Sequence, residues 1–317
     1  TMVMTGALFQ MTSVVGGHLL PGGARVAAVV YGGLTVGSVL FLMAMIEGRP
    51  MLFLAAACSL VLAVGVLAVC GLIAIKRARR YTPTLMSMKL SLVSLLVMIS
   101  VGAGLLLMYG YSDTFGFDRR WTDFHLLWAL AGWVGLLIMG VSFQVIPMFH
   151  VTPSFNIHFQ RGLPVVTFIS LIAASLSGFL YPKESLFYLF LSLLLICFFT
   201  FSVYVWRLLN QRKRKLDDVT VSLWRVAVIS FLAFIILQAA STLVDVESDQ
   251  VWLLSGVLLV YGGVMSVIGG MLQKIIPFLS YLHMQRFCAG DFNAIKALPH
   301  MRAILKQQHS KYFYRLH

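Results

Sequence analysis

The amino-acid sequence predicts an all-α, polytopic transmembrane helix bundle, and three observations support this class. The chain of 317 residues is 60% hydrophobic and only 11% charged, whereas a soluble domain carries about 25% charged residues. Its apolar residues form runs of about 20 residues, the length with which a helix spans a bilayer. Most of its basic residues gather at the ends of these runs. A chain of this composition has a lipid bilayer as its natural solvent.

Nine apolar segments are visible along the chain. They span residues 1–15, 26–46, 51–75, 84–110, 122–148, 161–180, 183–206, 220–243 and 251–278. The first segment is too short to cross a bilayer, because a spanning helix needs about 20 residues. The chain opens in mid-helix, and its last residues resemble the approach to another helix. We therefore expect both ends to be cut from a longer protein.

The distribution of Lys and Arg predicts the topology. The basic loops 76–83 and 207–219, and the C-terminal tail, each follow an apolar segment. The positive-inside rule assigns such segments to the cytoplasm. With alternate loops assigned accordingly, 20 of the 24 basic residues lie on the cytoplasmic side and four on the other. We expect a multi-pass protein of the bacterial inner (plasma) membrane.

The net charge of +13 does not indicate a nucleic-acid partner, because the basic residues border membrane segments. We expect them to contact the anionic lipids of the cytoplasmic leaflet. Segment 287–308 mixes apolar with basic residues and is interrupted by Pro299, which predicts a short interfacial segment. Other membrane subunits remain possible partners.

Three stretches of the sequence resemble one another and indicate an internal repeat. Residues 6–13 read GALFQMTS, residues 140–147 read GVSFQVIP, and residues 269–277 read GGMLQKIIP. When Pro147 is aligned with Pro277, each residue of the second copy lies 130 positions before its counterpart in the third. The first copy lies 134 positions before the second. We expect both prolines to end their helices at the cytoplasmic boundary.

The repeat predicts about twelve helices in three pseudo-symmetric sets of four, of which nine are visible. The first repeat, 1–83, lacks its N-terminal part, and the second, 84–216, is complete. The third repeat, 217–317, lacks its C-terminal part and includes the interfacial segment. Small residues let membrane helices approach closely. The glycines that recur at helical spacing, which we expect at such packing seams, are Gly132, Gly135, Gly140, Gly262 and Gly270.

Polar side chains recur near the cytoplasmic ends of the three repeated helices. They are Gln10, Gln144, Gln273 and Lys274. At membrane depth such groups face protein or water rather than lipid. They either line a polar vestibule for proton or solute entry, or bond to helix carbonyls that have lost their partners. Four histidines, His18, His150, His158 and His283, fall in loops or helix ends on this side, where we expect solvated side chains.

The segment 122–148 resembles a haem-bearing helix of the haem–copper oxidase catalytic subunit. The likeness rests on His125, Gly132, Trp133, Gly135, Gly140 and Pro147. It is closest to the bacterial high-affinity oxidase and nitric oxide reductase branches. Residues 7–23, ALFQMTSVVGGHLLPGG, resemble the end of that family's second helix. The resemblance implies twelve helices in three sets of four, with the second, sixth and tenth running from outside to inside.

The departures from the family pattern argue against oxygen or nitric oxide reduction. The family's tenth helix carries a His-x-His pair that binds both haems, and the alignment places Ser255 and Val257 there. The second copy retains His125 but has Leu127 at the other position. A copper site needs about three imidazoles, and a six-coordinate haem needs two axial ligands. We therefore expect a degenerate relative of the family, and leave open whether it is an enzyme.

His125 is the candidate cofactor-binding and metal-binding residue. The resemblance implies that it binds haem b or copper near the outer face, in a respiratory or metal-handling role. The alternative is an interfacial histidine beside Asp123 and Trp128, hydrogen-bonded at the helix start. Two other functions also remain open, a small-solute or ion permease that uses the polar vestibule, and a structural subunit of a membrane complex.

Overall fold

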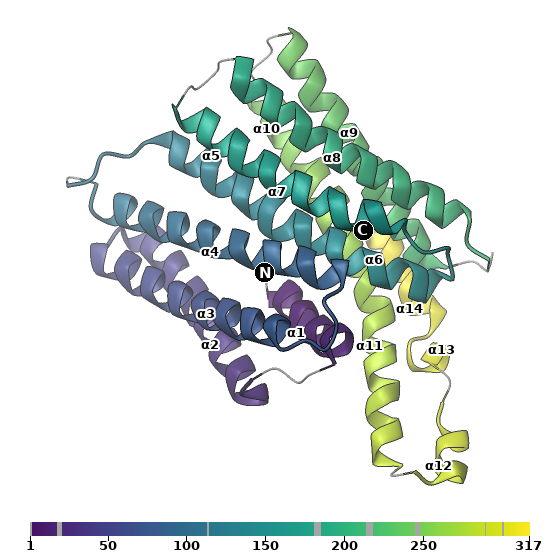
Figure 1. The fold of residues 1–317 in the computed structure, drawn as a ribbon. Coiled ribbons are helices and arrows are strands. Elements are labelled where there is room, and N and C mark those ends of the chain that lie inside the picture. Colours follow the sequence, from purple (N-terminus) through teal and green to yellow (C-terminus); the bar gives the residue numbers. More distant parts are fainter. Residues whose placement is uncertain are drawn as a thin grey trace. The chain divides into compact units, whose positions relative to one another are not determined.

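The computed structural model describes residues 2–17, 21–112, 114–180, 185–213, 218–244, 248–288, 290–299 and 301–317. Every regular element within these residues is a helix, and none is a strand (Figure 1). Eight of the described helical stretches are long and apolar enough to cross a membrane. The chain is therefore an integral, polytopic membrane protein, as the sequence predicted.

The helices follow the nine predicted segments closely. The elements that form these segments are α1 (Met2–Gly16), α2 (Gly23–Glu47), α3 (Pro50–Lys76), α4 (Pro83–Gly110), α5 (Arg119–Leu127), η1 (Trp128–Gly135), α6 (Leu136–His150), α7 (Ile157–Leu180), α8 (Ser185–Asn210), α9 (Val219–Val244), α10 (Asp249–Gly256), η2 (Val257–Met265) and α11 (Ser266–Phe287). The helix α1 has 15 residues and is not among the eight candidate spans, which confirms the prediction that it is too short. Three short helices close the chain, α12 (Phe292–Ala297), α13 (Met301–Ile304) and α14 (Gln307–Leu316).

Local sequence signals set the helix boundaries. Pro50 and Pro83 occupy the first turns of α3 and α4, where a missing N–H costs nothing. The side chain of Thr82 accepts a hydrogen bond from the Leu85 N–H at 3.3 Å and so caps α4. Ser248 caps α10 in the same way through the N–H of Val251. Gly48 ends α2 with a φ of 67°, a left-handed conformation that glycine adopts without a steric penalty.

Two predicted helix ends are wrong. Pro147 lies inside α6 and Pro277 inside α11, and both helices continue beyond the proline. A proline removes a backbone hydrogen bond from a helix, but membrane helices tolerate it where neighbouring elements or local adjustments satisfy the freed carbonyl. The interruption predicted at Pro299 is present, because α12 ends at Ala297 and α13 begins at Met301.

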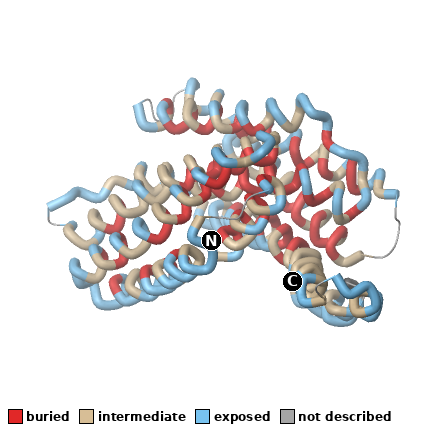
Figure 2. The backbone as a smooth tube through the Cα atoms, turned by 60° about the horizontal axis from the view of Figure 1, so that its bottom comes forward, coloured by how far each residue is buried: buried red, intermediate tan, exposed pale blue. Residues whose placement is uncertain are grey.

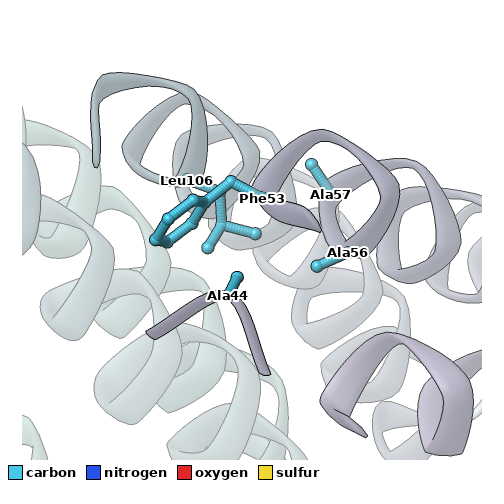
Figure 3. Packing of buried hydrophobic residues seen from close by; sticks show 5 residues of the cluster. All are labelled: Ala44, Phe53, Ala56, Ala57 and Leu106. Atoms are coloured by element: carbon cyan, nitrogen blue, oxygen red, sulfur yellow. The ribbon is translucent and has the colours of Figure 1, made fainter. Parts of the chain in front are cut away.

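One compact unit comprises residues 1–145 and 154–197. Within it α3 packs against both α2 and α4. A cluster of buried side chains joins these three helices, and Figure 3 shows its members, Ala44, Phe53, Ala56, Ala57 and Leu106. The alanines bring the helix backbones close together, as is usual where membrane helices associate by van der Waals packing.

The other compact unit comprises residues 146–153 and 198–317. Here α9 packs against η2 and α11, and its buried face includes Leu223, Trp224 and Ala227. Buried and exposed residues alternate along most of the long described helices, so these helices have a buried and an exposed side (Figure 2). Many outer residues are large and apolar, among them Ile46 and Leu189. A surface of this kind suits lipid rather than water.

Candidate functional site

His125 projects from α5 onto the middle of α4. Its Nδ1 lies 3.0 Å from the carbonyl oxygen of Met98, and the side chain is half-buried. The ring rests on Gly102, since a Cβ added to that glycine would lie 2.8 Å from the imidazole Cε1. A larger residue at position 102 would therefore displace the imidazole from this position. Trp128, three residues further along the chain, donates its indole N–H to Ser175 Oγ on α7 at 2.9 Å.

The hydrogen bond of His125 fixes the chemistry of its other ring nitrogen. A carbonyl oxygen can only accept, so Nδ1 of the neutral ring carries the proton and donates it. The Nε2 atom then keeps its lone pair. Histidines that bind metals usually have this arrangement, in which one ring N–H is held by a carbonyl and the other nitrogen coordinates. Held in this way, His125 would present Nε2 to a metal ion or a haem iron.

The donor set fits copper less well. Within the ranges that the structure describes, no group of three or more His, Cys, Asp or Glu side chains could hold a metal ion. A copper site built from about three imidazoles therefore has no match among these residues. A haem iron needs one protein nitrogen on each occupied face, and His125 offers one.

Two π-helical stretches interrupt the long membrane runs. The segment η1 covers Trp128–Gly135 and η2 covers Val257–Met265. A shift of 130 positions carries 128–135 onto 258–265, so the two stretches coincide almost residue for residue. π-Helices are rare and often lie at functional sites. Three of the glycine and tryptophan residues that carry the family resemblance, Gly132, Trp133 and Gly135, are buried in η1.

The helix that faces each π-segment approaches it at a glycine. A Cβ added to Gly132 would lie 2.7 Å from Ser94 Cβ on α4, and one added to Gly262 would lie 2.7 Å from Ser230 Cβ on α9. Real Cβ atoms essentially never come so close, so both crossings require glycine. The two serines lie 136 positions apart and the two glycines 130. The same contact is thus made twice, by different helices.

A second glycine repeats the pattern eight residues, about two turns, further on. A Cβ on Gly140 would lie 3.2 Å from the carbonyl oxygen of Thr84, and a Cβ on Gly270 would lie 3.5 Å from that of Thr220. Thr84 and Thr220 are again 136 positions apart. The pair α4 with η1–α6 and the pair α9 with η2–α11 therefore cross at corresponding residues.

The position 130 residues after His125 holds a small residue in place of the large imidazole. It is Ser255, which is 4% exposed and accepts a hydrogen bond from Gln238 Nε2 at 3.2 Å. Gln238 lies 136 positions after Gly102. In the first pair the large ring of His125 lies against Gly102. In the second pair the small hydroxyl of Ser255 accepts a hydrogen bond from the long side chain of Gln238.

The predicted vestibule residues fall in different surroundings. Gln10 and Gln144 have exposed side chains and belong to one compact unit. Gln273 and Lys274 belong to the other unit. Among the described residues the amide atoms of Gln273 are buried and have no hydrogen-bond partner. Lys274 Nζ lies 2.6 Å from Asp218 Oδ2.

Asp218 is a site residue that the sequence did not single out. It precedes α9, and its Oδ1 accepts hydrogen bonds from the Thr220 hydroxyl at 2.8 Å and the Thr220 N–H at 3.1 Å. Burial raises the pKa of Asp218, but the hydrogen bond and charge of Lys274, together with the two bonds from Thr220, outweigh it and hold the pKa below its ordinary value. The carboxylate therefore stays ionised.

His150 corrects another expectation. It was expected to be solvated, yet it is only 4% exposed at the end of α6. Its neighbour Phe149 contacts Phe278 of α11. His158 and His283 are exposed as expected, and His18 lies outside the described residues.

Comparison of the chain with protein-family models, with curated proteins and with solved structures finds no match.

Proposed function

We propose that this chain is a haem-binding membrane protein related to the haem–copper oxidase catalytic subunit, in which the Nε2 atom of His125 would hold a b-type haem. The observation that carries the proposal is the hydrogen bond from His125 Nδ1 to the Met98 carbonyl, which leaves Nε2 free to coordinate. A bound haem would supply reversible one-electron chemistry. We infer a role in electron transfer or haem handling rather than oxygen reduction, because a copper site lacks its imidazoles.

The chain's own residues would hold the ligand in place. The α4 carbonyl fixes the tautomer and the orientation of the ring, and Gly102 allows the ring to approach the helix closely. Trp128, three residues after His125, is buried and is anchored to Ser175 by a hydrogen bond. Preorganisation of this kind raises the affinity of a histidine for a metal about 10-fold to 100-fold.

We further propose that the chain is built from three four-helix repeats. The element bounds support this architecture. A shift of 134 carries Gly23–Glu47 and Pro50–Lys76 onto 157–181 and 184–210, where α7 and α8 cover Ile157–Leu180 and Ser185–Asn210. A shift of 136 carries Pro83–Gly110 onto 219–246, where α9 covers Val219–Val244. The inner-membrane location and the cytoplasmic placement of the basic loops belong to the same proposal and rest on charge.

Optical spectroscopy tests the haem proposal. The full-length protein, purified from cells supplied with a haem precursor, should show a Soret band that shifts on addition of dithionite. His125→Ala should lose the band, whereas His158→Ala, which removes an exposed histidine, should retain it. Wild-type protein without a Soret band, or a His125→Ala variant with undiminished haem, would contradict the proposal.

A further inference from the structure

A guanidinium group near the start of α9 is held by two side chains near the end of α8. Arg225 lies six residues after Val219, the first residue of α9. Its Nη2 donates a hydrogen bond to Asn210 Oδ1 at 3.1 Å, and its Cζ lies 5.7 Å from the ring centroid of Trp206. The face of a tryptophan attracts a cation at this distance. All of these residues belong to one compact unit, and together they order the charged end of a long side chain.

Most donors of this guanidinium have no partner among the described residues. The group carries five N–H donors, and the bond to Asn210 uses one of them. The Nε atom is buried and has no hydrogen-bond partner in the described part of the chain. The carboxylate of Asp218, at the start of α9, is engaged by Lys274 and Thr220 instead. A half-buried cation with unused donors requires an explanation, and an anionic ligand provides one.

Further cations lie close by along the chain. Arg207 is exposed and precedes Asn210 by three residues, a spacing that makes side chains neighbours on the surface of a helix. Arg212 and Lys213 follow in the loop after α8. Arginine matches the oxygens of a phosphate with parallel N–H bonds. The corner formed by the end of α8 and the start of α9 is therefore suited to a phosphate group.

Apolar side chains continue from this corner along both helices, away from the loop that joins them. On α8, exposed Phe199 lies seven residues before Trp206. On α9, exposed Ile229 lies four residues after Arg225. Residues at these spacings share one side of a helix. A molecule with an anionic head at Arg225 thus finds apolar surface for its tail, and a free phosphate ion has no use for that surface.

We propose that the α8–α9 corner is a binding site for one anionic phospholipid, whose phosphodiester is held by Arg225 with the help of Arg207. Trp206 and Asn210 position the guanidinium, and the acyl chains lie along the exposed apolar side chains. A zwitterionic lipid fits less well, because its ammonium group would add a cation to a corner that already carries several. The site is independent of the haem proposal.

The corresponding corner between α3 and α4 provides a comparison within the chain. A shift of 136 carries Lys89 onto Arg225, and a shift of 134 carries Leu72 onto Trp206. Lys89 is exposed, and a lysine at such a depth extends its ammonium group to the headgroup region. Positive charge is thus common to both positions. The planar guanidinium and the aromatic ring beneath it distinguish the α8–α9 corner, and these are the features that a bound phosphate uses.

Native mass spectrometry of the full chain, released from detergent micelles, tests the proposal with dioleoyl phosphatidylglycerol as the probe. The first lipid should bind Arg225→Gln at least about tenfold more weakly than the wild type, because a charge-assisted contact is lost. Trp206→Leu, which copies the residue of the α3–α4 corner, should weaken binding by about twofold to fivefold. Lys89→Gln is the matched control and should bind this lipid as the wild type does.

Two other probes identify the source of the phosphate. Dioleoyl phosphatidylcholine should bind at least about fivefold more weakly than phosphatidylglycerol, and excess inorganic phosphate should not displace the lipid. Equal binding of the two lipids, displacement by inorganic phosphate, or equal losses in Lys89→Gln and Arg225→Gln would overturn the proposal.

Size-exclusion chromatography establishes that each variant is folded. Arg225→Lys keeps the charge but loses the planar fork, so it should bind the lipid with an affinity between those of the wild type and Arg225→Gln. This variant and Trp206→Leu decide the question if Arg225→Gln does not yield monodisperse protein, and undiminished binding in both would overturn the proposal. The same results are expected with and without haem, so the haem proposal can fail while this one stands.

Discussion

The pair formed by α4 with α5–η1–α6 and the pair formed by α9 with α10–η2–α11 share a frame and differ in their polar residues. Both contain a π-helical stretch at the same position, and both cross at two glycines. His125 over Gly102 is replaced by Ser255 under Gln238, and uncharged Thr82 and Gln144 are replaced by Asp218 and Lys274. The shared glycines and π-helical stretches account for the packing of the helices. We expect function at the polar residues that differ between the two pairs.

The largest effect is predicted for the shared glycines. Gly132→Leu and Gly262→Leu should each destabilise the fold by more than about 3 kcal/mol and abolish monodisperse protein, because the added side chain has no room beside the facing serine. Gly104→Leu is the control, since a Cβ at Gly104 meets nothing within 4 Å among the described residues. Size-exclusion chromatography in detergent reports the outcome. An equal loss of monodisperse protein in all three variants would mean that the crossings at Gly132 and Gly262 do not specifically require glycine.

The large and small side chains are exchanged between the two sites. Substitutions of Ser255 and Gln238 should therefore be strongly coupled in their effects on stability. Ser255→His alone should destabilise the second pair, because Gln238 already occupies the space that an imidazole needs. Adding Gln238→Gly reproduces the environment of His125 and should recover about 0.5–3 kcal/mol of the loss. Thermal unfolding of the two single variants and the double variant measures this coupling. Strictly additive losses would show that the two sites do not correspond.

The ion pair predicts an acid sensitivity confined to the second pair. The pKa of Asp218 is lowered in the folded state, so its contribution to stability is fully present above the unfolded value of about 3.9 and is lost as the pH falls through the folded value. Asp218→Asn should cost about 1.5–3 kcal/mol at neutral pH and remove this acid-linked part of the unfolding free energy. Chemical unfolding in detergent at several pH values checks the result. An unchanged pH profile in the variant would argue against the lowered pKa.

The smallest effect is expected at a hydrogen bond found only in the first pair. Ser87 donates to the Leu136 carbonyl oxygen at 2.7 Å, whereas its counterpart, Leu223, has no side-chain donor. Ser87→Ala should cost about 0.5–1.5 kcal/mol. Leu223→Ala, by comparison, removes buried apolar surface and should cost about 2–5 kcal/mol. Reversal of that order would show that the polar contact contributes more than the apolar one.

The sequence predicted the helices well because hydrophobicity and length alone define a membrane segment. The predicted segment 220–243 differs from Val219–Val244 by one residue at each end. The sequence did not predict η1 and η2, because the apolar pattern of a π-helical stretch inside a buried helix hardly differs from that of an α-helix. The burial of His150 and the contact of Lys274 with Asp218 were missed for another reason: they depend on which helices pack together, and no local pattern encodes that.

A single measurement tests both halves of the comparison: a cryo-electron microscopy map of the full-length protein in lipid nanodiscs. Superposition of residues 84–150 on 220–280 should place Gly132 on Gly262 and Gly140 on Gly270. The map should show planar density against the Nε2 atom of His125 and none beside Ser255. Glycines that fail to coincide would contradict the common frame, and density absent at His125 or present at Ser255 would contradict the assignment of the ligand.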